Sequence, residues 1–229
     1  MRLRPVDALI GVMFFAALGA MLLAVRGEGD VAALLFLGAF LADALHSAAP
    51  TADAAHRLGV ELTNVVRLIA FGICPGVLLC FAYLPLGREI GIALGGTVVV
   101  TSAVRMALQA VRPLEGATIS SGLPRAFSAL FVVALSASSV FEYEAVRHVA
   151  IGLLPLVAAL NVTRIPFLRP FVQPCSWGRV GLCALLAASV GIGFALGSGF
   201  DVVLFWATIL LFAGPIAAWR PMAARERGA

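Results

Sequence analysis

Charged and amide side chains interrupt four of the long apolar stretches of this sequence. They are Asp43 with His46, Glu61 with Asn64 and Arg67, Arg105 with Gln109, and Asn161 with Arg164. Ionisable groups are costly inside a bilayer, so such residues mark a functional site or an ion pair. Carboxylates are ligands for divalent cations, and arginine pairs well with phosphate. Metal or phosphate binding is therefore the chemistry that these residues could perform.

The spacing within two of these groups indicates a shared site. Thr63 and Arg67 are four residues apart, so they share one helix face, and Gly59 lies a turn earlier on that face. Asp43 and His46 are three residues apart and also share a face. The two segments are joined by a short connection, which favours antiparallel neighbours. Asp43 and Arg67 can then meet.

The composition is that of a membrane protein. Of the 229 residues, 62% are hydrophobic and 12% are charged, and the mean hydropathy is +1.04. A soluble domain has about 45–50% apolar and about 25% charged residues, so the composition excludes a soluble domain, a disordered chain and a coiled coil. At about 20 residues per span, the chain has room for at most about eight or nine spans. We expect one integral-membrane domain over residues 1–229.

The apolar stretches predict an all-α bundle of eight transmembrane helices. Glycine, proline and acidic residues mark the breaks between them, as in the run from Gly27 to Asp30. The predicted spans are Val6–Val25, Val31–Ala48, Val60–Leu84, Ile90–Val111, Leu123–Val140, Ala145–Val162, Val180–Leu196 and Val202–Trp219.

The arginines outside the spans predict the orientation. All 16 basic residues are arginine; eleven fall at the N-terminus and in every second connection, and three fall on the opposite side. This bias places both termini in the cytoplasm. The arginines do not cluster as a nucleic-acid groove requires, so we expect no nucleic-acid partner. We expect a multi-pass protein of a bacterial cytoplasmic membrane, with all four polar groups towards the cytoplasm and able to converge on one cavity.

Several segments resemble the CDP-alcohol phosphatidyltransferases, specifically the phosphatidylserine synthase branch. The family motif reads D-x2-D-G-x2-A-R, then eight or nine residues, then G-x3-D-x3-D. In the serine branch the second half reads like E-L-D-S-L-A-D-V-V-S-F-G-V-A-P, and Glu61–Pro75 (E-L-T-N-V-V-R-L-I-A-F-G-I-C-P) falls on it without a gap. Gly59 falls on the motif glycine. Residues 103–110, the run Gly122–Pro124 and residues 163–167 match later segments of the branch in part.

The resemblance implies a site at which four aspartates bind two Mg²⁺ or Mn²⁺ ions. These ions hold the pyrophosphate of CDP-diacylglycerol, and the last aspartate helps to deprotonate the attacking alcohol. In this sequence the four positions are Asp43, His46, Thr63 and Arg67. Asp43 is thus the one remnant of the metal site, and no catalytic set is intact.

Other residues of the resembled site are retained. By resemblance, Gly59, Arg105 and Arg164 are substrate-binding positions, because the two arginines match basic positions that can face lipid phosphate. The first motif glycine is replaced by Ser47, and the A-R pair by Pro50 and Thr51.

These departures should abolish metal-dependent transfer. Two hard cations need several oxygen ligands, and Arg67 would repel them. Arginine also cannot act as a base. We therefore expect no cofactor, and predict instead an ion pair between Asp43 and Arg67, with Glu61 as a competing carboxylate.

We accordingly expect an inactive family member that binds anionic phospholipid, CDP-diacylglycerol or a partner protein, and the resemblance makes a homodimer plausible. Two alternatives remain: an active phosphatidyltransferase with an altered site, which would use Mg²⁺ or Mn²⁺, and a small membrane transporter. A transporter needs a polar path to both faces, whereas the polar residues lie towards one side.

Overall fold

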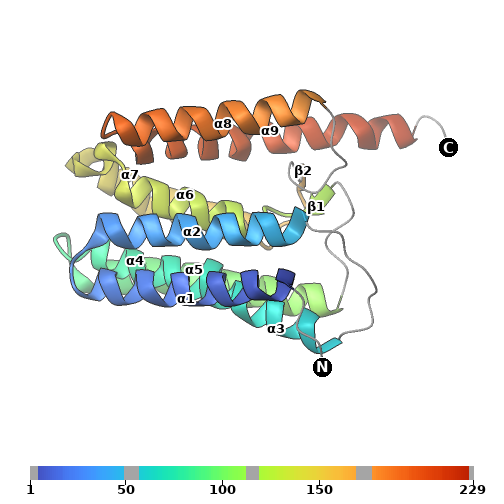
Figure 1. Cartoon of the computed structure of the whole chain (residues 1–229). Coiled ribbons are helices and arrows are strands. Elements are labelled where there is room, and N and C mark those ends of the chain that lie inside the picture. The colour runs from blue at the N-terminus through green and yellow to red at the C-terminus, as the bar shows by residue number, and fades with distance from the viewer. Residues whose placement is uncertain (1–4, 49–56, 112–118, 169–176, 227–229) are drawn as a thin grey trace. The chain divides into compact units, whose positions relative to one another are not determined.

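The computed structural model describes residues 5–48, 57–111, 119–168 and 177–226 (Figure 1). The chain divides into two compact units, Met1–Ala110 (unit 1) and Val111–Ala229 (unit 2). Each unit is built almost entirely of helices, apart from one two-stranded sheet in unit 2.

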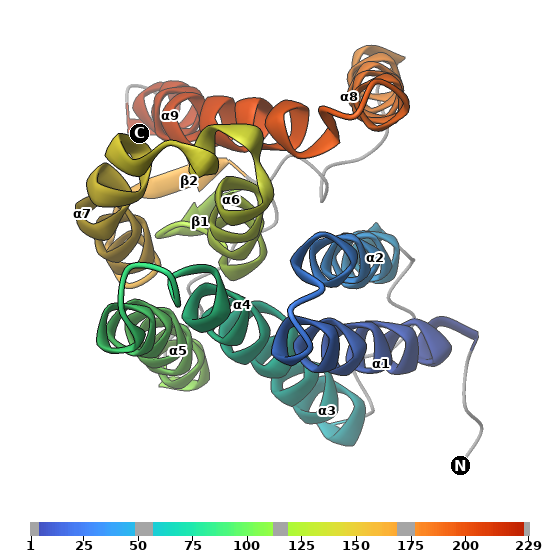
Figure 2. The same ribbon diagram turned by 90° about the vertical axis from the view of Figure 1, so that its left-hand side faces the viewer.

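Unit 1 begins with a helical hairpin. Helices α1 (Pro5–Val25) and α2 (Gly29–Ala48) lie side by side in Figures 1 and 2. Gly27 has φ of 82°, a backbone conformation that glycine adopts without strain, and it allows the chain to reverse there. Small buried residues from both helices, including Ala17, Ala20 and Ala32, let the two backbones approach closely.

The third predicted span is one long helix with a π-helical segment in its middle. It consists of α3 (Arg57–Leu68), η1 (Ile69–Ile73) and α4 (Cys74–Ala82). Pro75 lacks an N–H, so the carbonyl of Phe71 loses the donor that an α-helix would supply. The helix widens at this point, with the Cys74 N–H bonded to the carbonyl of Ile69. Ser102 Oγ donates to the carbonyl of Phe71 over a long 3.5 Å and partly replaces the missing bond.

Helix α5 (Arg88–Val111) packs against this long helix through glycines. A Cβ added at Gly95 would overlap the carbonyl oxygen of Gly76, and one added at Gly91 would lie 2.7 Å from the carbonyl oxygen of Cys80. A Cβ at Gly72 would lie 2.9 Å from Cβ of Ser102. The partners run in opposite directions along the two helices, so α5 is antiparallel to α3–α4.

Unit 2 contains helices α6 (Arg125–Ala137), α7 (Glu144–Leu160), α8 (Trp177–Ala195) and α9 (Gly199–Glu226), with the 3-10 turn η2 (Ser139–Glu142). Helix α9 packs against α6 and α8. Asp201 near its start accepts hydrogen bonds from the backbone N–H and the hydroxyl of Ser139, both at 2.8 Å. These bonds fix η2 to the beginning of α9.

The fifth predicted span is shorter than expected. The prediction was Leu123–Val140, whereas α6 has 13 residues and ends at Ala137. Ser138 is extended (φ −82°, ψ 153°), and its hydroxyl donates to the carbonyl of Leu135 at 2.8 Å. This local bond competes with continuation of the helix, which is why the apolar pattern overestimates its length.

The small antiparallel sheet in unit 2 was not predicted. Strand β1 (Ile119–Ser121) pairs antiparallel with β2 (Pro166–Leu168). The backbone N–H of Gly122 adds a bond of 2.7 Å to the carbonyl of Ile165. Strands of three residues carry too little periodicity to be detected.

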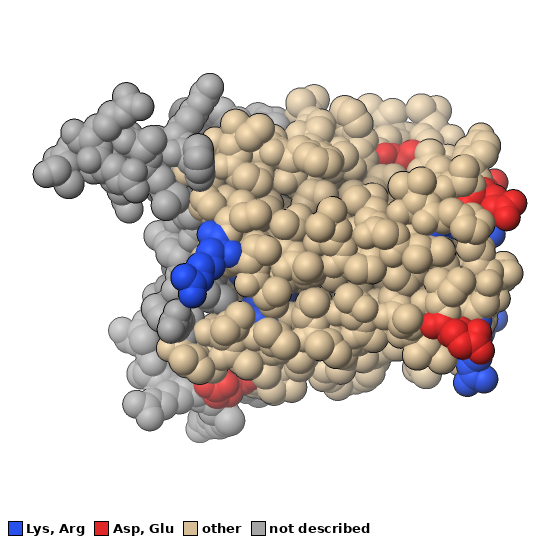
Figure 3. All heavy atoms as spheres, turned by 180° about the vertical axis from the view of Figure 1, so that it is seen from behind, with Lys and Arg blue, Asp and Glu red and all other residues tan. Residues whose placement is uncertain are grey.

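The prediction of a helical membrane protein is confirmed. Within the described residues, five helices are long and apolar enough to cross a membrane: Ala8–Val25, Gly29–Ser47, Val60–Ala82, Arg88–Val111 and Gly199–Ile216. Many of their large apolar side chains are exposed, such as Phe15, Val100 and Phe205. Figure 3 shows a largely uncharged surface along the helices, with charged residues near the helix ends. The count of eight spans and the orientation stay predictions.

Candidate functional site

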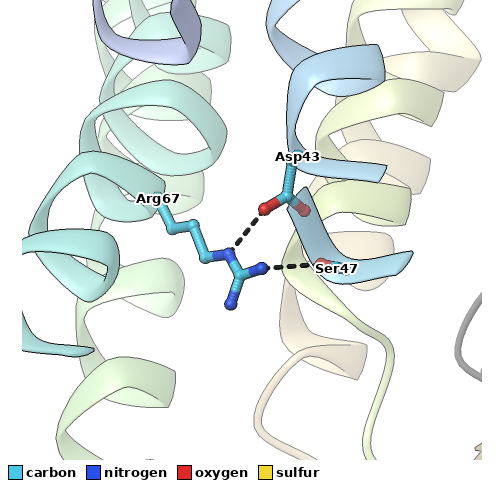
Figure 4. A network of polar contacts seen from close by, with 3 residues as sticks. All are labelled: Asp43, Ser47 and Arg67. Atoms are coloured by element: carbon cyan, nitrogen blue, oxygen red, sulfur yellow. Dashed lines mark hydrogen bonds and ion pairs between the residues drawn. The ribbon is translucent and has the colours of Figure 1, made fainter. Parts of the chain in front are cut away.

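An ion pair between α2 and α3 is the centre of the candidate site (Figure 4). Arg67 Nε donates to Asp43 Oδ1 at 2.6 Å, and Arg67 Nη2 donates to Ser47 Oγ at 2.8 Å. The predicted contact between Asp43 and Arg67 is therefore confirmed. The bond to Ser47 was not predicted.

Local helix geometry explains why these three side chains meet. Asp43 and Ser47 are four residues apart on α2, so both lie on the same face of that helix. Arg67 lies in the last turn of α3. One guanidinium spans both acceptors because its N–H groups form a rigid planar fork. The i, i+4 spacing of Asp43 and Ser47 was the signal that could have identified Ser47 as a second acceptor.

The site is largely shielded from solvent. The Arg67 side chain is 24% exposed and that of Asp43 is 13% exposed. Hydrogen bonds between charged groups are roughly twice as strong as neutral ones. Removal of either partner would leave the other charge partly buried and uncompensated, which is more costly than loss of the bond alone. Glu61, the predicted competitor, is exposed, and the ion pair found among the described residues is with Asp43.

The other predicted site residues of unit 1 surround this pair to different degrees. Thr63 is buried at 7% exposure on α3, and His46 is half-buried on the last turn of α2. Gly59 lies on α3, but its surroundings are outside the described structure. Arg105 on α5 is fully buried at 0% exposure.

The antiparallel packing of α5 shows which residues of the long helix α3–α4 lie level with Arg105. Ser102 lies against Gly72 of the long helix. Arg105 is one turn further along α5, so it lies at about the level of Leu68, next to Arg67 in the sequence. Two arginines therefore lie at this end of unit 1.

Unit 2 holds the remaining predicted residues. Asn161, directly after α7, is buried at 1% exposure, whereas Arg164 is exposed before β2. The predicted convergence of these residues with those of unit 1 on one cavity stays a prediction.

The donor set does not fit a two-cation centre. Within the described part of the chain, no group of three His, Cys, Asp or Glu side chains could hold a metal ion. The one carboxylate at the motif positions, Asp43, is partly buried and already accepts a bond from Arg67. A divalent cation at Asp43 would have to displace this guanidinium and would then meet its charge at close range.

Comparison with known proteins does not assign the chain to a family. No protein-family model matches the sequence, and no curated protein matches it significantly.

Proposed function

We propose that this chain is an integral membrane protein of the CDP-alcohol phosphatidyltransferase type that binds anionic phospholipid and does not perform metal-dependent transfer. The observation that carries the proposal is the Asp43–Arg67–Ser47 network. It occupies the first and fourth metal positions of the motif that the sequence resembles. At these two positions the chain has an ion pair, whereas the transfer reaction would need ligands for two cations.

The chemistry of the network supports a binding role over a catalytic one. Metal-assisted phosphoryl transfer depends on cations to neutralise developing charge. Arg67 can neutralise charge but cannot accept a proton from an attacking alcohol. Arg105 and Arg164 retain the basic character that phosphate recognition requires. In this proposal the lipid is bound and released unchanged.

The proposed function also requires a membrane topology that brings the site to the lipid headgroups. We propose eight spans in one domain, with both termini in the cytoplasm of a bacterial membrane and with homodimerisation possible. The uneven distribution of arginines supports the orientation. The Asp43–Arg67 pair then lies towards the cytoplasmic side, where the headgroups of inner-leaflet lipids are found.

The test is release of CMP from CDP-diacylglycerol by the purified protein. Serine, glycerol phosphate, inositol and choline are offered as acceptors, with Mg²⁺, with Mn²⁺ and with a chelator. We expect no release above a control preparation from membranes without the protein. Metal-dependent release would overturn the proposal and favour the active alternative, with Glu61 and Asp53 as the first candidates for missing ligands.

A further inference from the structure

We infer that the π-helical segment η1 is a conformational device that sets the rotation of α3, so that Arg67 points at Asp43. Pro75 and Ser102 keep the segment in its π form. If the segment changed to α-helix, α3 would turn about its axis relative to α4 and the ion pair would open. The inference goes beyond the proposed function, because it assigns a control of the site and no ligand.

Before and within η1, the long helix is attached to one face of α2. Arg67 bonds Asp43, and the ring of Phe71 packs edge-on against the rings of Phe36 and Phe40, at centroid distances of 6.1 and 6.4 Å. Phe36, Phe40 and Asp43 are spaced at i, i+4 and i+7, so they share that face of α2. The direction of Arg67 therefore depends on the rotation of α3 against α2.

Beyond η1, the long helix is fixed against α5 instead. A Cβ added at Gly76 would lie 2.8 Å from the carbonyl oxygen of Gly95 and 2.8 Å from Cγ2 of Val99. Such close contacts leave α4 little freedom to rotate. In contrast, α3 exposes large apolar side chains such as Leu62 and Val65. A change in the winding of η1 would therefore be taken up by α3.

The size of this rotation follows from helix geometry. The Cys74 N–H bonds to the carbonyl of Ile69, five residues earlier, so this turn encloses one residue more than an α-helical turn. One residue of α-helix corresponds to a rotation of about 100°. Conversion of η1 to α-helix at constant chain length would thus turn α3 by about that angle. Arg67 would then leave the face of α2 that carries Asp43.

Proline alone does not impose the π form. Pro155 lies inside α7, which stays α-helical over its 17 residues. At Pro75 a second helix contributes, because Ser102 Oγ donates to the carbonyl of Phe71 at 3.5 Å. A Cβ at Gly72 would lie 2.9 Å from Cβ of Ser102, so the missing side chain lets α5 come this close. Helix α5 thereby supplies a donor to the carbonyl that the proline leaves without its α-helical partner.

The experiment compares how far Arg67→Gln lowers the melting temperature of the purified full chain in different backgrounds. In the wild type we expect a clear fall, because the substitution removes the ion pair. In a Pro75→Ala background, residue 75 gains an N–H for the carbonyl of Phe71, and η1 can become α-helical. Arg67 then no longer faces Asp43, so Arg67→Gln should lose at least half of its effect. Pro155→Ala is the matched control background and should preserve the full effect.

A deletion separates rotation from general damage. Removal of Ile69 from the Pro75→Ala variant takes out the extra residue of the π turn, so α3 and α4 keep their directions within one regular α-helix. The effect of Arg67→Gln should then return. Ser102→Ala is a milder change that removes the donor to Phe71, and it should reduce the effect in the same direction as Pro75→Ala.

Two results would overturn the inference. One is an equal effect of Arg67→Gln in the wild-type, Pro75→Ala and Ser102→Ala backgrounds, because the π form would then not direct the guanidinium. The other is a deletion of Ile69 that fails to restore the effect, which would mean that Pro75→Ala merely loosens unit 1. If the Pro75→Ala protein does not fold, the Ser102→Ala and Pro155→Ala backgrounds decide by the same criterion. Neither result changes the proposed function, which depends on the separate measurement of CMP release.

Discussion

At the scale of single residues, the Asp43–Arg67 pair joins two neighbouring apolar helices through a partly buried ion pair. Two charged residues inside neighbouring apolar helices must find partners, because an isolated charge in lipid is costly. That constraint sufficed to predict their contact. Ser47 was missed because a serine near a helix end has many possible partners, so its type alone does not identify one. Nor did the sequence reveal that Arg67 would use two of its three nitrogens to bond α2.

The coupling within this pair can be measured directly. Asp43→Asn and Arg67→Gln should each destabilise the protein by about 1–3 kcal/mol, because each leaves a partly buried charge without its partner. The double variant should cost clearly less than the sum of the two single variants. Reversible unfolding in mixed micelles provides the measurement, with Arg88→Gln as the exposed control. Simple additivity would show that the two side chains do not interact in the membrane-like environment.

At the scale of elements, the tight packing of α5 against the long helix depends on glycines, which have no reactive side chain. Hydropathy predicted the long helix and α5 as spans, and both are present. It did not predict their glycine contacts, since glycine spacing in a sequence this rich in glycine and alanine is close to chance. The π-helical segment is a similar case. Pro75 predicts a distortion of the helix, but the shape of that distortion also depends on the bond from Ser102 of another helix.

Two adjacent glycines provide a matched test of this packing. Gly95→Ala should destabilise unit 1 by at least about 2 kcal/mol, because its Cβ would overlap the Gly76 carbonyl and the helices would have to separate. Gly96→Ala makes the same chemical change where nothing lies within 4 Å, so it should be neutral or slightly stabilising. The melting temperatures of both purified variants test this prediction. Similar melting temperatures would mean that α4 and α5 do not pack through this surface.

At the scale of the whole molecule, the arginines outside the predicted spans are distributed unevenly between alternate connections. The three turns α1–α2, α4–α5 and α6–α7 carry the carboxylates Glu28, Glu89 and Glu142, with few arginines. The sequence predicted this asymmetry, because the charged residues of each connection can be counted without knowledge of the structure. It could not predict the limited length of α6, since the Ser138 hydroxyl donates to the carbonyl of Leu135 and the helix ends there, inside an apolar run.

The orientation that follows from this asymmetry is open to a direct test. Alkaline phosphatase, which is active outside the cytoplasm, is fused after Gly27, after Gly87 or after Gly197, the positive-φ glycines of three turns predicted to face outwards. We expect activity from all three fusions and none from a fusion at the C-terminus, because the arginine-rich connections should stay in the cytoplasm. A fluorescent protein that folds in the cytoplasm should give the reverse pattern. If the fusions after Gly27 and Gly87 were inactive, the Asp43–Arg67 end of unit 1 would lie outside the cell, and an inner-leaflet lipid could no longer be its ligand.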